Sequence, residues 1–504
     1  LQSTLFGPVK YALLPQHLGV DELMRANGWI EAGTFVAILL GTVAGGLMAA
    51  GGDAARLPLG LACMTIAAAG YPHMRTPNLD ALAGRGVLFE NAFCNAPVSM
   101  PSRQSMLSGR YPSTVGCTCN GIEMPPGIPT VWDILRPYGY RAANFGKLHF
   151  RNHSNRDHRT PHPTYGLDTL ILSDEPGCYE DAYVQWVRRR DPDQVENCRC
   201  GTPPAWTGRP VEKVRSPVVP YVFEGPEDMT HSAFTAEETA DFVRRHRDEA
   251  FFAIAGFFAP HCPLNPPARF VEMYDPAELP APAMNPGEDR FDLSEAEWLR
   301  IRAHYYALVS HVDDQAGRIL TALDEAGLRE DTLVIFTSDH GDHLGDHGTV
   351  GKGAPGLDSC AHVPLIVSWP GHLPEGATHR NLIEAVDLLP TILECCAVQV
   401  PPFAQGRSFR PLLEGEDYEP RRSAYIEHRV PFRDSWKTVR TADFKYCVGS
   451  HAGERLYDLR TDRHELRDVA GDAGYADVLA EMRAELIRRS FDVENQYPPR
   501  TGHY

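Results

Sequence analysis

The sequence predicts an α/β fold in which a mostly parallel sheet is flanked by helices and followed by a small antiparallel subdomain. Two continuous apolar runs, residues 251–258 and 332–337, are typical of buried parallel strands, and polar, titratable residues follow each of them. Residues 295–326 lie between these runs and have the pattern of a long amphipathic helix. Short alternating strands from about residue 420 and a final helix at 476–489 indicate the C-terminal subdomain.

Length and charge restrict the classes of function. The chain has 504 residues, which suffices for two or three domains and a large core. The net charge of −18 disfavours nucleic acid as a partner and requires any anion site to be locally basic. The 12 cysteines lack the spacing of structural zinc sites, and their scatter fits reduced thiols better than a disulfide framework. Cysteines that are mostly reduced favour a cytoplasmic location for the main domain.

Residues 1–70 are predicted to be a separate apolar helical segment. Residues 32–52 carry no charge and are long enough to span a bilayer. Gly41 and Gly45 in this run allow close helix packing in a membrane. A buried helix of a soluble domain is the alternative, but the run lacks a polar face. Residues 29–70 are therefore the predicted region of membrane contact.

Two parts of this segment, residues 6–17 and 22–35, resemble a piece of the major-facilitator transporters. The likeness is closest to the lysophospholipid-transporter branch and covers about residues 1–69. Two spans cannot form the paired helix bundles that alternating access needs, so transport is not the expected activity.

The α/β domain is predicted for residues 71–415 and the C-terminal α+β subdomain for residues 416–504. A short helix is expected from 76–80 to Gly84, followed by strands at 87–93, 140–145, 251–258, 332–337 and 363–367. Sites in open α/β sheets form at the carboxyl ends of the strands, so the polar residues that follow these strands are expected to meet.

A candidate nucleophile follows the strand at 87–93. Ser99 precedes Pro101, and proline favours the first turn of a helix, so Ser99 is expected at a helix N-terminus, where free N–H groups attract anions. Arg103 lies one turn further on, on the same face. This arrangement suits attack on a sulfate or phosphate ester. An ordinary capped helix accounts for these five residues equally well.

The sequence Ser-Met-Pro-Ser-Arg at 99–103, continued by Leu-Ser-Gly-Arg at 107–110, resembles the signature of the sulfatases in the alkaline-phosphatase-like superfamily. In that family the first residue is Cys or Ser and is oxidised to formylglycine. The resemblance therefore implies a sulfatase-maturation enzyme that acts on Ser99. Met100 stands where the family has a small residue, and Ser108 stands where Thr is more usual.

Asp339 and His340 directly follow the strand at 332–337 and are a candidate divalent-metal half-site. A polar turn is the alternative interpretation. His343 and His347 are four residues apart, as two histidine ligands on a zinc-binding helix are. However, a glycine interrupts the helix here, and the glutamate of the zinc-protease motif is absent. Asp339 is therefore the favoured ligand.

Residues 339–348 resemble the second metal motif of the sulfatases, and similar blocks in the family's order span about residues 71–470. The resemblance implies an alkaline-phosphatase-like fold and a set of site residues. It implies that Asp339, His340 and Ser99 bind Ca2+ or another divalent cation. It also implies that Arg103, Lys147 and His149 contact the nucleophile and the sulfate. His261 would contact the leaving group, and Lys352 would bind the sulfate.

The implied reaction is hydrolysis of a small-molecule or carbohydrate sulfate ester by the hydrated formylglycine made from Ser99. Sulfatases of this kind begin with a strand that ends in paired aspartates, both of them metal ligands. Here residues 61–70 occupy that place and contain no carboxylate. The domain is thus predicted to lack its normal first strand, to bind calcium weakly and to be impaired. A gene fusion and a shifted reading frame both account for the replacement.

Two other hypotheses stay open. One is a phosphodiesterase or phosphonate monoester hydrolase on the same fold. The other is a non-catalytic, membrane-anchored protein whose site binds an anion.

Overall fold

The computed structural model describes residues 67–69, 71–151, 162–177, 179–200, 216–430 and 433–494. All of them belong to one compact unit, Leu59–Tyr504. Nearly all of the predicted N-terminal segment, including the predicted span at 32–52 and almost the whole transporter-like piece, lies outside the described residues. Within the part of the chain that is described, no helix is both long enough and apolar enough to cross a membrane.

The elements alternate along the α/β domain and end in a strand-rich C-terminal part. The strands are β1 Val87–Phe93, β2 Arg141–Gly146, β3 Thr169–Leu172, β4 Phe251–Gly256, β5 Val334–Thr337, β6 His362–Ser368, β7 Ala377–Glu384, β8 Ala424–Arg429, β9 Ser435–Arg440, β10 Phe444–Gly449 and β11 Gly453–Asp458. The helices are α3 Pro77–Gly84, α4 Ser99–Ser108, α5 Pro112–Val115, α6 Val131–Leu135, α7 Ala182–Arg190, α8 Val195–Cys198, α9 His231–Arg245, α10 Ala268–Val271, α11 Glu295–Glu325, α12 Asp358–Ala361, α13 Leu388–Cys395, α14 Arg410–Glu414 and α15 Ala476–Val493.

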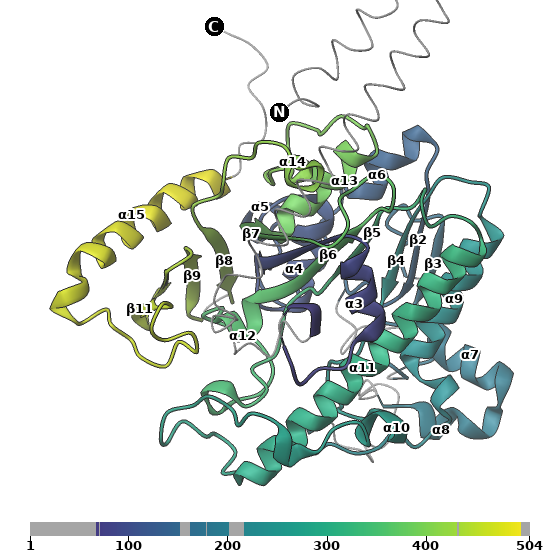
Figure 1. Ribbon diagram of the computed structural model, residues 1–504, viewed down its shortest axis with the longest axis horizontal. Coiled ribbons are helices and arrows are strands. Elements are labelled where there is room, and N and C mark those ends of the chain that lie inside the picture. Colours follow the sequence, from purple (N-terminus) through teal and green to yellow (C-terminus); the bar gives the residue numbers. More distant parts are fainter. Residues whose placement is uncertain are drawn as a thin grey trace, which may run out of the picture. The chain divides into compact units, whose positions relative to one another are not determined.

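These strands form separate sheets (Figure 1). The first sheet has the order β5-β6-β1-β7, and the second has the order β3-β2-β4 with parallel pairing throughout. The C-terminal strands form an antiparallel sheet of order β11-β10-β9-β8, which α15 covers. The predicted α/β class and the predicted antiparallel C-terminal part agree with this arrangement.

The predicted parallel pairing is found for β1–β7, β2–β3 and β2–β4, and the described strands differ from the prediction in two respects. First, β6 is antiparallel to both of its neighbours, β1 and β5, so the first sheet is mixed. Second, β4 and β5 were expected as buried strands, but among the described residues each is at an edge of its sheet, and most of their residues are only half-buried. An apolar run predicts contact with apolar surroundings, and it does not specify whether a strand or a cavity lies beside it.

Helices α9 and α11 cover the α/β domain on one side (Figure 1). The start of α11 is fixed by a capping box, in which the Ser294 backbone N–H donates to Glu297 Oε2 at 2.8 Å. Asp313 in the middle of α11 accepts the Leu79 N–H at 2.7 Å and so caps α3. The long amphipathic helix predicted for 295–326 is confirmed, and it anchors α3 to the domain.

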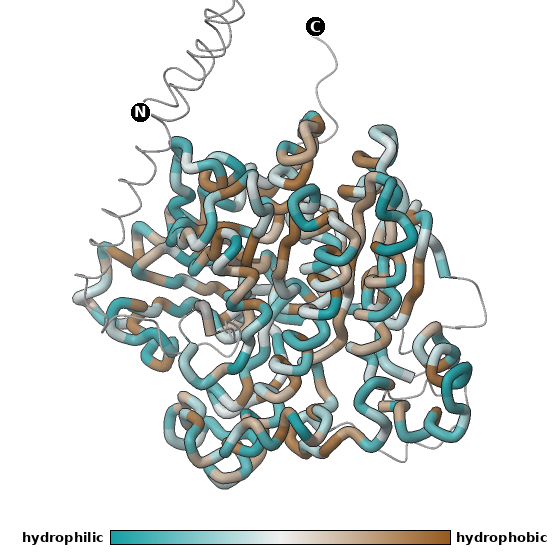
Figure 2. Tube along the Cα trace, turned by 45° about the vertical axis from the view of Figure 1, so that its right-hand side comes forward, coloured by the Kyte–Doolittle hydropathy of each residue, from teal (hydrophilic) through white to brown (hydrophobic). Residues whose placement is uncertain are grey.

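Hydrophobic residues are more frequent along the inner segments of the trace, and hydrophilic residues are more frequent along the outer ones (Figure 2). One core cluster joins β1, β6 and β7 to α14, with Phe89, Phe93 and Phe409 fully buried. Burial of aromatic side chains of this size is a large favourable contribution to folding.

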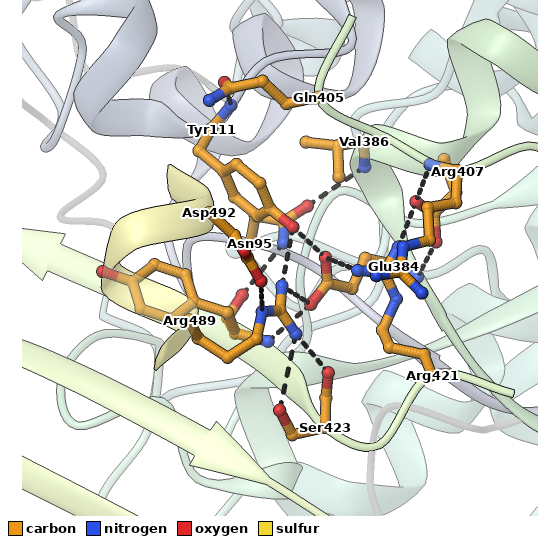
Figure 3. A network of polar contacts seen from close by, with 12 residues as sticks. Asn95, Tyr111, Glu384, Val386, Gln405, Arg407, Arg421, Ser423, Arg489 and Asp492 are labelled. Atoms are coloured by element: carbon orange, nitrogen blue, oxygen red, sulfur yellow. Dashed lines mark hydrogen bonds and ion pairs between the residues drawn. The ribbon is translucent and has the colours of Figure 1, made fainter. Parts of the chain in front are cut away.

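A buried ionic network ties the C-terminal helix to the α/β domain (Figure 3). Glu384, at the end of β7, accepts from Arg489 of α15 at 2.8 Å and forms an ion pair with Arg421 at 3.0 Å. Tyr111, which precedes α5, donates to the same carboxylate at 2.5 Å, and Tyr425 N–H donates to it at 2.6 Å. A single fully buried carboxylate therefore holds several segments that are distant in sequence.

We expect Glu384→Ala to lower the free energy of unfolding by about 3–5 kcal/mol, because it leaves Arg489 and Arg421 buried without this partner. Denaturant unfolding followed by circular dichroism measures the change. The half-exposed pair Arg410–Glu414 is the control, and Glu414→Ala should cost roughly 0.5 kcal/mol or less. A loss below about 1 kcal/mol for Glu384→Ala would contradict the role given to this network.

Candidate active site

Polar residues from two sheets come together where their strands end. β1 and β5 run in the same direction because both are antiparallel to β6, and β2 and β4 are parallel to each other. Ser99 starts the helix after β1, Lys147 follows β2, His261 follows β4 and Asp339 follows β5. The last three of these residues line one cavity, and Ser99 bonds to two other residues of its wall.

Ser99 is the first residue of α4, as the sequence predicts. Val98 before it is extended, and Gly109 ends the helix in the left-handed region at φ 65°. A side chain at Gly109 would be strained at that φ, and its Cβ would lie 3.0 Å from Leu389 Cβ. The helix is therefore fixed at both ends, and it holds Ser99 in a buried position.

The backbone N–H groups of Met100 and Ser102 at the start of α4 are engaged by other residues. The Met100 N–H donates to Asn120 Oδ1 at 2.9 Å, and Pro101 has no N–H. The Ser102 N–H donates to Val98 O at 3.2 Å. Anion binding near Ser99 therefore depends on side-chain cations more than on these groups.

Arg103 joins α4 to the ends of two strands. Its Nε donates to Asp339 Oδ2 at 2.7 Å, and its Nη1 donates to Lys147 O at 3.1 Å. Ser102 Oγ adds a hydrogen bond to Asp339 O. Burial would raise the pKa of Asp339, but the nearby charges of Arg103 and Lys147 hold it well below its usual value. Asp339 is therefore ionised and accepts a charge-assisted hydrogen bond.

Lys147 is a buried cation on the cavity wall. Its side chain is 3 % exposed, and its Nζ lies 5.3 Å from the centroid of the Phe258 ring. Burial, together with repulsion from Arg103, lowers the pKa of Lys147 to about 7. Its charge therefore changes near neutral pH.

The loop that carries Lys147 is held by Asp174, which lies just after β3. Asp174 Oδ1 accepts the Leu148 N–H at 2.9 Å and the His149 N–H at 2.7 Å. His149 has a φ of 55° and is buried. Lys147 lines the cavity, whereas His149 is not among the described residues of its wall.

Lys352 reaches Ser99 from the loop after β5. Its Nζ donates to Ser99 Oγ at 3.3 Å. The loop is fixed by Asp342, whose Oδ1 accepts the Leu344 and Gly351 N–H groups, each at 2.9 Å. Burial lowers the pKa of Lys352. This second lysine places a cation directly beside the candidate nucleophile.

His340 lies on the other side of Ser99. Its Nε2 is 2.8 Å from Ser99 Oγ, and its Nδ1 is 2.8 Å from Gly341 O. A carbonyl oxygen only accepts, so the ring proton is on Nδ1 and Nε2 accepts from the Ser99 hydroxyl. Burial lowers the pKa of His340 to about 3, which keeps the ring neutral. Ser99 Oγ thus lies between an acceptor and a cationic donor.

His261 lines the same cavity and is half-buried. Its Nδ1 is 2.8 Å from Cys262 O, and its ring centroid is 4.8 Å from that of Phe258. The carbonyl partner places a proton on Nδ1.

The described residues do not fit a divalent cation. They contain no group of three or more His, Cys, Asp or Glu side chains placed to hold a metal. The Asp339 carboxylate is bonded to Arg103, and His340 Nε2 is bonded to Ser99. Lys147, which is buried, and Lys352, which is half-buried, add positive charge that opposes the binding of a metal cation. The predicted ligands Asp339, His340 and Ser99 therefore lie close together, but not as a metal site.

Sequence reasoning missed several residues that position this site. Asp174, Asn120 and Phe258 were not singled out, although each contacts a predicted site residue or its loop. A signal existed for Asp174, because it follows a strand as the other site residues do. Asn120 does not follow a strand, so its position gave no such signal. Its hydrogen bond to the Met100 N–H depends on the path of the loop that brings it back to α4.

Comparisons with known proteins agree on one family. The profile of the family described as Sulfatase matches residues 52–398, and the profile described as N-sulphoglucosamine sulphohydrolase, C-terminal, matches residues 345–492. The first match begins inside the predicted transporter-like segment, and the transporter resemblance of residues 1–69 has no support in these comparisons.

Individual relatives extend over most of the chain. An arylsulfatase of Clostridium perfringens is 28 % identical over 466 residues, which cover 85 % of this chain and 92 % of the relative. A human iduronate 2-sulfatase is 29 % identical and covers 67 % of each chain. The crystal structure of a phosphonate monoester hydrolase of Agrobacterium radiobacter has a TM-score of 0.75 and 27 % identity, covering 86 % of this chain and 94 % of that one.

We expect the affinity for inorganic sulfate to fall by up to about tenfold per pH unit above pH 7, because Lys147 loses its charge as the pH rises through its pKa of about 7. Isothermal titration calorimetry between pH 6 and pH 9 measures this dependence. Lys147→Arg keeps the charge and should bind sulfate with much less dependence on pH. An affinity of the unaltered protein that is constant over this range would show that Lys147 does not titrate with the anion.

Proposed function

This chain belongs to the sulfatase family, and we propose that it hydrolyses sulfate esters at the Ser99 site. The observation that carries the proposal is the position of Ser99 Oγ, 3.3 Å from Lys352 Nζ and 2.8 Å from His340 Nε2, at the start of the helix whose half-buried Arg103 donates to Asp339 and to Lys147 O. Sulfuric ester hydrolysis requires a nucleophile next to a pocket for an anion, and these contacts support both.

In this proposal the cationic side chains of the site bind the sulfate group of the ester. Arg103 is neutralised in large part by Asp339, so Lys147 and Lys352 provide the charge for the non-bridging oxygens of the ester. Their positions are fixed before substrate arrives, because Asp174 and Asp342 hold the two loops. Preorganised charge of this kind is usually the largest contribution to stabilising a transition state.

The nucleophile in this proposal is formylglycine made from Ser99 by a sulfatase-maturation enzyme. When hydrated, that group supplies one hydroxyl for attack on sulfur and a second whose loss of a proton expels sulfate. His261 or Lys352 donates the proton to the departing alcohol, and His149 accepts the proton from the second hydroxyl. One water is consumed for each ester, and the products are an alcohol and sulfate.

We propose a small-molecule or carbohydrate sulfate ester as the substrate. The arylsulfatase and iduronate 2-sulfatase relatives support this class. A cytoplasmic catalytic domain is part of the same proposal, and the free thiols of the described cysteines support it. Membrane contact through residues 29–70 stays a prediction.

A second candidate is hydrolysis of phosphonate monoesters or phosphodiesters on the same fold. The structural likeness to the Agrobacterium radiobacter phosphonate monoester hydrolase favours it. A panel of an aryl sulfate, an aryl phosphonate monoester and an aryl phosphodiester separates the two, and we expect the sulfate to have the highest kcat/KM.

We expect Ser99→Ala to reduce hydrolysis of an aryl sulfate by at least about 10³-fold, because no other hydroxyl takes the place of the nucleophile. Ser99→Cys should retain activity in a host that matures cysteine. Ser108→Ala, at the other end of α4, is the control and should stay near the activity of the unaltered chain. Mass spectrometry of the Ser99 peptide should show the loss of two hydrogens. Full turnover by Ser99→Ala would place the chemistry elsewhere.

We expect calcium to bind no tighter than about 10⁻⁴ M and activity to be low, because Asp339 is paired with Arg103 and residues 61–70 contain no carboxylate. Replacing residues 59–66 with an apolar strand that ends in two aspartates should increase both affinity and turnover. Calorimetry with Ca2+ on both proteins measures the difference. Equal and tight binding by the two would mean that other residues complete a metal site.

A further inference from the structure

Helix α15 has apolar side chains on two of its faces. One face covers the sheet β11-β10-β9-β8, and Leu479, Met482 and Leu486 on that face are buried in its core (Figure 1). Ile487 and Phe491 point to the other side of the helix and are 60 % and 64 % exposed. Single exposed apolar side chains are ordinary, but neighbouring ones mark a contact surface. The outer face of α15 is therefore a candidate interface.

The exposed apolar residues continue along the helix as a stripe. Ala480, Ala484, Ile487 and Phe491 are all exposed and follow one another at intervals of four, three and four residues. This period of about 3.5 residues is the one by which a second helix packs along the first. We call these four residues the α15 stripe, and its spacing indicates that its partner is another helix.

The α15 stripe is complementary to an antiparallel copy of itself. When two copies of α15 pack antiparallel about a two-fold axis, Ala480 lies opposite Phe491 of the second copy, and Ala484 lies opposite its Ile487. Every layer then pairs a small side chain with a large one, which lets the two helices pack closely. A parallel pair would place Phe491 against Phe491. Self-complementarity of this kind is what a two-fold dimer requires.

The charges that flank the stripe favour the same arrangement. Glu481 and Arg488 lie on one side of it, seven residues apart, so an antiparallel pair places each Glu481 beside Arg488 of the other copy. Glu481 now pairs with Arg422, and Arg488 pairs with Glu485 and Asp492. Glu481 and Arg488 are 60 % and 49 % exposed, so exchanging their partners costs little.

We propose that two copies of this chain associate through the α15 stripe, as an antiparallel helix pair about a two-fold axis. The stripe is about three helical turns long. A standard interface buries roughly 1,600 Å² in total, and a single helix pair of this length buries less. We therefore expect a dimer that forms and dissociates with concentration. This inference concerns assembly and does not depend on the reaction proposed above.

Analytical ultracentrifugation of the full chain, from roughly 1 μM to 1 mM, tests the proposal. We expect the mass to rise toward that of a dimer, and Phe491→Glu to weaken association at least tenfold because it buries a charge in the seam. Val219→Glu, at an apolar residue that is 62 % exposed outside α15, is the matched control and should leave association unchanged. Association that Phe491→Glu does not weaken, or a chain that stays monomeric, would overturn the proposal. A monomer in which Ile487→Cys is shielded from a thiol reagent would assign the stripe to another segment of the same chain.

Charge reversal tests the antiparallel orientation without altering the apolar residues. Glu481→Arg and Arg488→Glu should each associate several-fold more weakly than the unaltered chain at low salt, because each places like charges opposite one another. An equimolar mixture of the two variants should associate more strongly than either alone, since every contact between the copies again joins opposite charges. The double variant Glu481→Arg/Arg488→Glu should likewise recover. A mixture that associates no better than its components would refute the antiparallel pair.

Discussion

The arrangement of the site depends on the fork made by Arg103. Its guanidinium contacts the carboxylate after β5 and the carbonyl after β2, two strands that belong to different sheets. Because no ladder hydrogen bonds connect these sheets in the described residues, this side chain is a direct polar link between their carboxyl ends. Arginine suits the role, since it is always charged and presents several donors in a fixed plane. The same helix that carries Arg103 begins at Ser99, so the link also sets where the nucleophile lies.

The electrostatics of the site are local. The whole chain carries a charge of −18, yet the cations Arg103, Lys147 and Lys352 lie together at this site, and Asp339 forms an ion pair with Arg103. Screening at physiological salt acts over about 8 Å, so distant carboxylates have little effect inside this buried cluster. Desolvation of Lys147 and Lys352 outweighs the effect of the nearby carboxylates and lowers the pKa of both lysines. A bound oxyanion would favour the charged forms of these two lysines.

Short-range patterns predicted the parts of the fold that depend on neighbouring residues. Pro101 and Gly109 mark the two ends of α4, and the apolar runs locate β4 and β5 to within a few residues. The position of Ser99 followed from the same local rules. The separation of the sheets could not be predicted, because it depends on which strand pairs with which. The engagement of the Met100 N–H by Asn120 likewise depends on a loop contact that no periodicity encodes.

The network around Glu384 has a consequence for how the protein is made. Glu384 and its partner Arg489 are separated by 105 positions in the chain. A ribosome that adds roughly 5–20 residues per second delivers that stretch in about 5–20 s. During this interval the carboxylate and Tyr111 exist without the helix that completes their surroundings. The α/β domain thus lacks these contacts until α15 has been synthesised.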